Sequence, residues 1–267
     1  MSRNQNRVNI SQVPAQQSSI YTPPTTHVIL PSKGRFYPEG HPLHNCESIE
    51  IKEMTTKEEE ILMNESLLRQ GLVVDRLIES VIINNNVSAD TLLVGDKNAI
   101  IVAMRIEGYG KEYEISVPCP ACGHLNEKEV DLSLLKPADE ATDLEMTPNG
   151  TFMVTLPKTN VVVELKLLTG EDEKIILETN EKTKKYGLER PIATQYSRMI
   201  VSVNGNTDAS EISALVSNLP IRDSRVIRKT YKKANPDMDM SFHFQCDNCN
   251  HERGMEVPIT ANFFWAD

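Results

Sequence analysis

Two Cys-x-x-Cys pairs constrain the fold of this chain more than any other feature of its sequence. The first is Cys119-Pro-Ala-Cys122 and the second is Cys246-Asp-Asn-Cys249, so that Cys246 follows Cys122 by 124 positions. Apolar residues alternate with polar ones on both sides of each pair, as in Tyr113, Ile115 and Val117. Because period-two alternation around a tight turn is typical of a β-hairpin, we expect two hairpins, each with a thiol pair at its tip.

Two such tips facing each other supply the four thiolates of a tetrahedral structural zinc site. We therefore predict that Cys119, Cys122, Cys246 and Cys249 bind zinc as the two halves of a zinc ribbon that a long insertion splits. Four thiolates leave no open coordination position, so the metal is expected to be structural and not catalytic. We expect the two histidines that follow the pairs, His124 and His251, to be turn residues or hydrogen-bond donors to the ligands.

Redox chemistry and disulfide formation are the alternatives for these cysteines. A redox Cys-x-x-Cys motif needs a βαβ setting with the pair at a helix start, and neither pair has a helical pattern behind it. The N-terminal 26 residues lack the hydrophobic stretch of a signal peptide, so we expect a soluble intracellular protein whose thiols stay free or metal-bound. The fifth cysteine, Cys46, is expected to be a free thiol, buried or half-buried.

The charge of the chain argues against nucleic acid as a partner. The formal net charge is −10, and a four-thiolate zinc site would make it more negative. Nucleic-acid-binding zinc ribbons usually carry a basic footprint instead. The one cationic cluster runs from Arg222 to Lys233, and we interpret it as the solvated face of a helix.

Signals for membrane insertion and for catalysis are missing from the sequence. No apolar run approaches the length of a membrane span. There is no nucleophile-elbow motif, Walker loop or dinucleotide fingerprint, and the six histidines do not have metal-catalytic spacing. We therefore predict no catalytic residue, no cofactor-binding residue beyond the metal ligands and no small-molecule substrate, and we expect that the protein is not an enzyme.

The chain divides into four regions of an α+β protein. Residues 1–26 are polar and form either a disordered tail or an arm that orders against a partner. Residues 27–132 form an N-terminal α+β region, helical in part, that ends in the first zinc hairpin. Residues 133–240 form the inserted lobe, with a hairpin over Thr151–Leu168 and several helices. Residues 241–267 hold the second zinc hairpin and an aromatic C-terminus, which we expect to pack on the protein itself.

Helix boundaries follow from capping residues and breakers. Thr56 and Glu59 have the spacing of a capping box, and Gly71 is expected to split the helical pattern that follows. Asp96 is expected to cap a helix from about Lys97 to Glu107. Further helices are predicted by apolar periodicity. They cover residues 171–186, a buried stretch at 191–203, and residues 210–218 and 221–234.

Short segments spread along the chain carry a resemblance to a known family. They are Leu30-Pro-Ser-Lys-Gly-Arg-Phe-Tyr37, Met54-Thr-Thr-Lys-Glu-Glu59, Val94-Gly-Asp-Lys-Asn98, Ile106-Glu-Gly-Tyr-Gly110, Leu219-Pro-Ile-Arg-Asp-Ser224 and the terminal Phe-Phe-Trp. In these segments the chain resembles the baseplate hub proteins of T-even-type contractile-tailed phages. This family includes a small hub subunit and a related hub assembly protein. The resemblance covers residues 28–267 and carries over no active-site residue.

The resemblance implies a role in building the central hub of a phage tail baseplate, with other tail proteins as partners. The first hypothesis is a structural component of the virion, located in the tail baseplate and assembled in the host cytoplasm. The second is an assembly factor or chaperone that builds the hub and then leaves. The third, from another class, is a zinc-ribbon nucleic-acid-binding or regulatory protein, against which the acidic charge counts.

Overall fold

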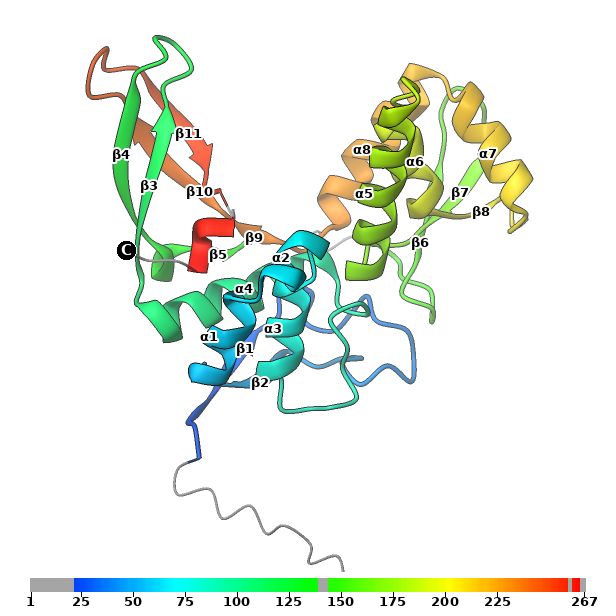
Figure 1. The fold of residues 1–267 in the computed structure, drawn as a ribbon. Coiled ribbons are helices and arrows are strands. Elements are labelled where there is room, and N and C mark those ends of the chain that lie inside the picture. The colour runs from blue at the N-terminus through cyan, green and yellow to red at the C-terminus, as the bar shows by residue number, and fades with distance from the viewer. Residues whose placement is uncertain (1–21, 139–143, 259–260, 265–267) are drawn as a thin grey trace, which may run out of the picture.

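The structure is a computed structural model that describes residues 22–138, 144–258 and 261–264. A base of strands and helices carries two arms that rise from it on opposite sides (Figure 1). One arm consists of two β-hairpins, and the other is a lobe of helices on a small sheet, which we call the lobe (residues 144–236). The protein is therefore of mixed helix and strand, as the sequence predicts.

The base is built from the N-terminal elements. These are β1 (Thr25–Ile29), β2 (Ser48–Lys52), α1 (Thr56–Leu62), α2 (Glu65–Gln70), α3 (Val73–Val81) and α4 (Val94–Tyr109). Strands β1 and β2 pair antiparallel, with Val28 opposite Ile49. Both of these side chains are buried, and on α3 the residues Val73, Leu77 and Val81 follow helical spacing and are buried as well. The core of the base thus forms between a two-stranded sheet and the apolar sides of its helices.

The first helical stretch differs from the prediction in its number of helices and in its cap. Three short helices replace the expected two, because Asn64 caps α2 by accepting from the N–H groups of Ser66 and Leu67. The capping box uses Thr55 and Glu58, one residue earlier than predicted. Glu58 is buried and also accepts from Lys52 and Ser80, so tertiary partners fix this register.

The prediction that Asp96 caps α4 is wrong. The helix begins at Val94, three residues earlier than expected, and Asp96 lies inside its first turn and is buried. Its carboxylate accepts from the Ser32 N–H (2.9 Å), the Ser32 hydroxyl (2.5 Å) and the Tyr37 hydroxyl (2.9 Å). Burial raises the pKa of Asp96, while these donors counteract the rise. The carboxylate thus holds the loop before β2 against the helix start, and Tyr37 packs inward.

The lobe combines a three-stranded antiparallel sheet with four helices. Its elements are β6 (Phe152–Thr155), β7 (Val162–Leu165), α5 (Gly170–Lys185), α6 (Pro191–Met199), β8 (Ile200–Val203), α7 (Ala209–Asn218) and α8 (Ile221–Ala234). The predicted hairpin is β6–β7, and α8 has the predicted bounds. The predicted buried helix over 191–203 is wrong in its last four residues, where the chain becomes strand β8 beside β7. Ile200 and Ser202 alternate inward there, and strand pairing outweighs the helical pattern.

The lobe is an insertion whose entry and exit lie side by side. The two-residue strands β5 (Lys136–Pro137) and β9 (Met238–Asp239) pair antiparallel where the chain leaves and re-enters the base. Gly95 at the start of α4 allows this close approach, since a Cβ atom there would lie 1.8 Å from the Pro236 carbonyl oxygen. Lys97 and Lys174 both contact the Asp75 carboxylate, which is a further link between base and lobe.

The C-terminal segment packs on the base, as predicted for its aromatic residues. Phe263 and Phe264 in the 3-10 turn η2 (Ala261–Phe264) are buried, and Phe263 meets the Tyr113 ring edge-on. The Arg105 guanidinium donates to the Phe263 carbonyl (2.9 Å) and to the Gly110 carbonyl (2.8 Å). Trp265 lies outside the described residues, as does the predicted N-terminal arm up to residue 21. The described chain enters strand β1 at Thr25.

Candidate metal centre

Both predicted cysteine hairpins are present. Hairpin 1 consists of β3 (Glu112–Pro118) and β4 (Leu125–Asp131), and hairpin 2 of β10 (Ser241–Gln245) and β11 (Glu252–Glu256). Each pair is antiparallel and in continuous register, from Glu112 opposite Asp131 to Pro118 opposite Leu125 in hairpin 1. The two hairpins rise together from the base, with their turns at the far end (Figure 1).

The two turns have the same backbone geometry. The N–H of the first cysteine donates to the carbonyl of the histidine five residues later, Cys119 to His124 at 2.8 Å and Cys246 to His251 at 3.0 Å. The residues before the histidines, Gly123 (φ 72°) and Asn250 (φ 54°), both adopt the left-handed conformation. Glycine and asparagine are the residues that tolerate it most readily, which explains their presence here. The histidines are turn residues, as expected.

The turns bring all four predicted ligand atoms together. The Sγ atoms of Cys119 and Cys249 lie 3.7 Å apart, as do those of Cys122 and Cys246, and all four lie within 4.8 Å of one another. Disulfide-bonded sulfurs would be about 2.05 Å apart, so these are four thiols. A tetrahedral metal with metal–sulfur bonds of about 2.3 Å requires sulfur–sulfur edges of roughly 3.8 Å. The arrangement is compatible with a bound metal ion.

Backbone N–H groups of the turns point at the sulfurs. Ala121 donates to Cys119 Sγ at 3.4 Å, and the His124 N–H lowers the pKa of the Cys122 thiol. The His251 N–H lowers the pKa of Cys249, but hydrogen bonds with the neighbouring thiols and burial raise it to about 12. Burial raises the pKa of Cys246, but N–H groups of Cys249 and Asn248 outweigh it and lower that pKa to about 6. Such donors stabilise thiolates, which are the form that binds a metal.

Asn126 links the two turns and was not predicted. This buried side chain donates to the His124 carbonyl of its own turn and accepts from the Asp247 N–H of the other, both at 2.8 Å. Lys128 adds an ion pair to Asp247 at 2.5 Å. The sequence does hold a signal for this residue, since Asn126 is a polar side chain at an inward position of the alternation, opposite Val117.

The remaining cysteine and the α8 cations match their predictions. Cys46 is a free, half-buried thiol. Arg222, Arg225, Arg228 and Lys229 are exposed on α8. None of the helices in the described ranges has both the length and the apolarity that a membrane crossing requires.

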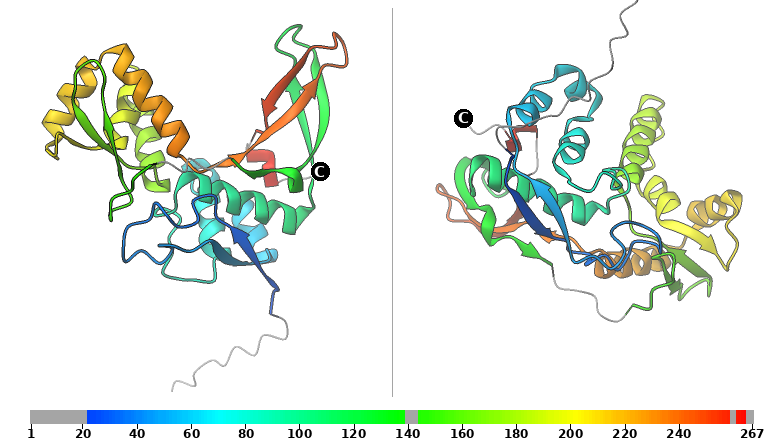
Figure 2. Two further views of the ribbon diagram at one scale, coloured as in Figure 1. Left: turned by 180° about the vertical axis from the view of Figure 1, so that it is seen from behind. Right: turned by 90° about the horizontal axis from the view of Figure 1, so that it is seen from below.

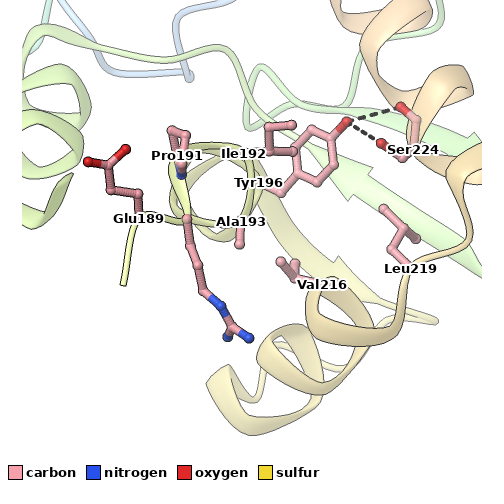
Figure 3. Close-up of a pocket in the computed structure, with 9 residues that line it drawn as sticks. Glu189, Pro191, Ile192, Ala193, Tyr196, Val216, Leu219 and Ser224 are labelled. Atoms are coloured by element: carbon pink, nitrogen blue, oxygen red, sulfur yellow. Dashed lines mark hydrogen bonds between the residues drawn. The ribbon is translucent and has the colours of Figure 1, made fainter. Parts of the chain in front are cut away.

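A shallow pocket of about 320 Å³ lies in the lobe, between α6, α7 and the start of α8 (Figure 3). Its lining is largely apolar and includes Ala193, Val216 and Leu219. The Tyr196 hydroxyl donates to the Ser224 carbonyl (3.0 Å) and lies 2.8 Å from the Ser224 hydroxyl. These polar groups hold α6 to α8, which is a packing role.

A family model described as T4 bacteriophage base plate protein matches residues 23–265, nearly the whole chain. No curated protein matches the chain. No solved structure matches it either.

Proposed function

The chain belongs to the T4 bacteriophage base plate protein family, and on that premise we propose that it is a structural component of the baseplate hub. Membership of this family implies a location in the virion tail and interaction with other phage tail proteins. The placement in the hub rests on the resemblance of the segments quoted above, from Leu30–Tyr37 to Leu219–Ser224. Assembly in the host cytoplasm is part of the same proposal.

The proposal includes a structural zinc ion bound by Cys119, Cys122, Cys246 and Cys249. It is supported by sulfur–sulfur distances of 3.7 Å, close to the roughly 3.8 Å edge of a four-thiolate zinc tetrahedron. The zinc would supply a closed, four-coordinate link between the two hairpins. The protein's own residues prepare this link, because the turn N–H groups favour thiolates and Asn126 fixes the spacing of the turns.

Such a link would matter because neither hairpin is stable alone. An isolated two-stranded hairpin is at best marginally stable in water. The metal would also close a loop of more than a hundred residues that contains the lobe, which lowers the entropy of the unfolded chain. We propose that the arm of two hairpins is a rigid part that the zinc holds in shape.

We propose further that the protein is not an enzyme. Four thiolates would saturate the metal, and the hydroxyls at the lobe pocket bond to each other and to backbone. The function is then carried by surfaces and not by a reaction.

Quantitative mass spectrometry of purified, intact phage particles tests the proposal, combined with zinc analysis of the isolated protein. A hub component is expected at a fixed small number of copies per particle, with one zinc per chain. Abundance in infected cells together with absence from particles would contradict the structural role. It would support instead a hub assembly factor that leaves before the virion is complete.

A further inference from the structure

Helix α8 presents an exposed basic face on an otherwise acidic chain. We define the basic face as Arg222, Arg225, Arg228, Lys229 and Lys232, which together line a shallow hollow with Val226. All five cations are exposed, and across the described residues none forms an ion pair with a carboxylate. The acid of this helix, Asp223, is buried and accepts from Lys158 and Thr159 instead. Like charges three and four residues apart on a helix destabilise it, so the basic face costs the free protein stability.

The outer face of hairpin 1 carries the opposite charge. We define the acidic stripe as Glu112, Glu114, Glu127 and Glu129, which are exposed and lie on the side turned away from the buried Tyr113, Ile115 and Val117. Glu114 lies directly opposite Glu129 in the strand register, an arrangement of like charges that destabilises a sheet. In the described ranges these four carboxylates also have no cation at ion-pair distance.

The two surfaces match in length and in their ends. Arg222 to Lys232 spans about 15 Å along the helix axis, at about 1.5 Å per residue. Glu112 to Ser116 spans about 14 Å along β3, at about 3.4 Å per residue. Each surface ends in an exposed large aliphatic side chain, Ile221 (80% exposed) before the basic face and Leu125 (60% exposed) beyond the acidic stripe. Aliphatic side chains bordered by charges are typical of protein interfaces.

The two surfaces lie on different arms of the molecule (Figures 1 and 2). Among the described residues neither surface has an ion-pair partner, and a contact between the two surfaces would join two copies. Because the contact joins different surfaces, it would be head-to-tail, and a pair of copies would keep one free basic face and one free acidic stripe for further copies.

We propose that the basic face of α8 docks on the acidic stripe of hairpin 1 in a second copy of this chain. The matched aliphatic ends set the direction, with Ile221 of one copy beside Leu125 of the next. This contact goes beyond the proposed place in the hub and does not depend on it.

Two charge-reversed variants test the contact, with sedimentation velocity of the full-length, metal-loaded protein as readout. One carries Arg225→Glu, Arg228→Glu and Lys229→Glu, and the other carries Glu114→Lys, Glu127→Lys and Glu129→Lys. A control with Lys184→Glu and Lys185→Glu reverses exposed charges on α5. Circular dichroism and zinc content establish that each variant is folded.

The wild type is expected to associate at about 50 mM salt and to dissociate at about 500 mM, where charges are screened within a few ångströms. Each reversed variant alone is expected to weaken association at least about tenfold, while the control does not. An equimolar mixture of the two reversed variants is expected to associate again, because their altered surfaces are complementary.

A wild type that stays monomeric at low salt and high protein concentration would overturn the proposal. So would failure of the two folded variants to associate when mixed. A monomeric wild type that binds an oligonucleotide with steep salt dependence, lost in the α8 variant, would assign the basic face to nucleic acid instead.

Discussion

Hairpin 1 buries Tyr113, Ile115, Val117 and Val130 on its inner face, whereas hairpin 2 fully buries only Phe244 of its strand residues. Hairpin 1 also has strands of seven residues against five, and Arg105 ties its start to the C-terminal segment. Both hairpins nevertheless end in the same cysteine turn. The same cysteine turn can thus be built on a well-packed hairpin or on a sparsely packed one. The comparison implies that the proposed zinc stabilises hairpin 2 more than hairpin 1.

Removal of the metal ligands is expected to have the largest effect. The double substitution Cys246→Ser and Cys249→Ser should destabilise the protein by more than about 5 kcal/mol and yield insoluble or protease-sensitive material. Treatment of the wild type with a chelator should accelerate amide hydrogen exchange first in β10 and β11 and later in β3 and β4. A double variant as stable and monodisperse as the wild type would rule out the zinc link.

The second effect concerns the apolar contacts of each hairpin. Phe244→Ala should cost about 3–5 kcal/mol, because Phe244 is fully buried while its apolar neighbours in hairpin 2, Phe242 and Met255, are only partly buried. Val130→Ala in hairpin 1 should cost about 1–3 kcal/mol, since three buried neighbours on the same face remain. Urea unfolding of the metal-loaded variants measures both. If the two losses of unfolding free energy differ only as much as the sizes of the removed side chains predict, the two hairpins are equally supported.

The link between the turns should have a smaller effect. Asn126→Leu leaves the Asp247 N–H and the His124 carbonyl without their buried partner, at a cost of about 1–3 kcal/mol. Glu127→Gln is the control, because this exposed side chain lies on the outer face of the same strand and should cost less than about 0.5 kcal/mol. A chelator competition assay should show weaker zinc binding for Asn126→Leu alone. Similar zinc affinities for the two variants would remove Asn126 from the site.

The smallest expected effect is electrostatic and concerns the Asp131 carboxylate at the end of β4 in hairpin 1. The Lys111 ammonium 2.8 Å away lowers the pKa of Asp131 to about 2, with help from Ser133. Because the folded pKa is depressed, this contribution is present above the ordinary value of 3.8 and disappears as the pH falls through about 2. A carboxyl titration by NMR should show this pKa moving back up in Lys111→Ala. An unchanged pKa in that variant would mean that the Ser133 donors suffice.

The sequence predicted the cysteine site well because the information there is local. A tight turn with thiols at fixed spacing and alternation on both sides is compatible with few structures, and the four cysteine sulfurs lie together as predicted. Asn126 escaped prediction because its partners belong to the other hairpin, more than a hundred residues away.

The errors elsewhere share one physical cause. Asp96 has the residue type and position of a helix cap, yet it is buried by contacts with Ser32 and Tyr37, which lie about sixty residues earlier. Residues 200–203 follow a helix without a breaker but become a strand because β7 offers backbone partners. Local patterns identify what a segment can form, and long-range partners decide between the options.

The four-thiol cluster can form only late in the synthesis of the chain, because its two cysteine pairs are synthesised at different times. Hairpin 1 leaves the ribosome with two thiols in place, and Cys246 follows 124 residues after Cys122. At bacterial elongation rates this delay is on the order of 10 s, long compared with the folding of a small domain. The lobe therefore has time to fold before its second tether exists, and pairing of β5 with β9 would then bring the late hairpin to the waiting turn. Completion of the cluster becomes one of the last events in making the protein, so a truncated chain that ends within the lobe carries an unfinished site.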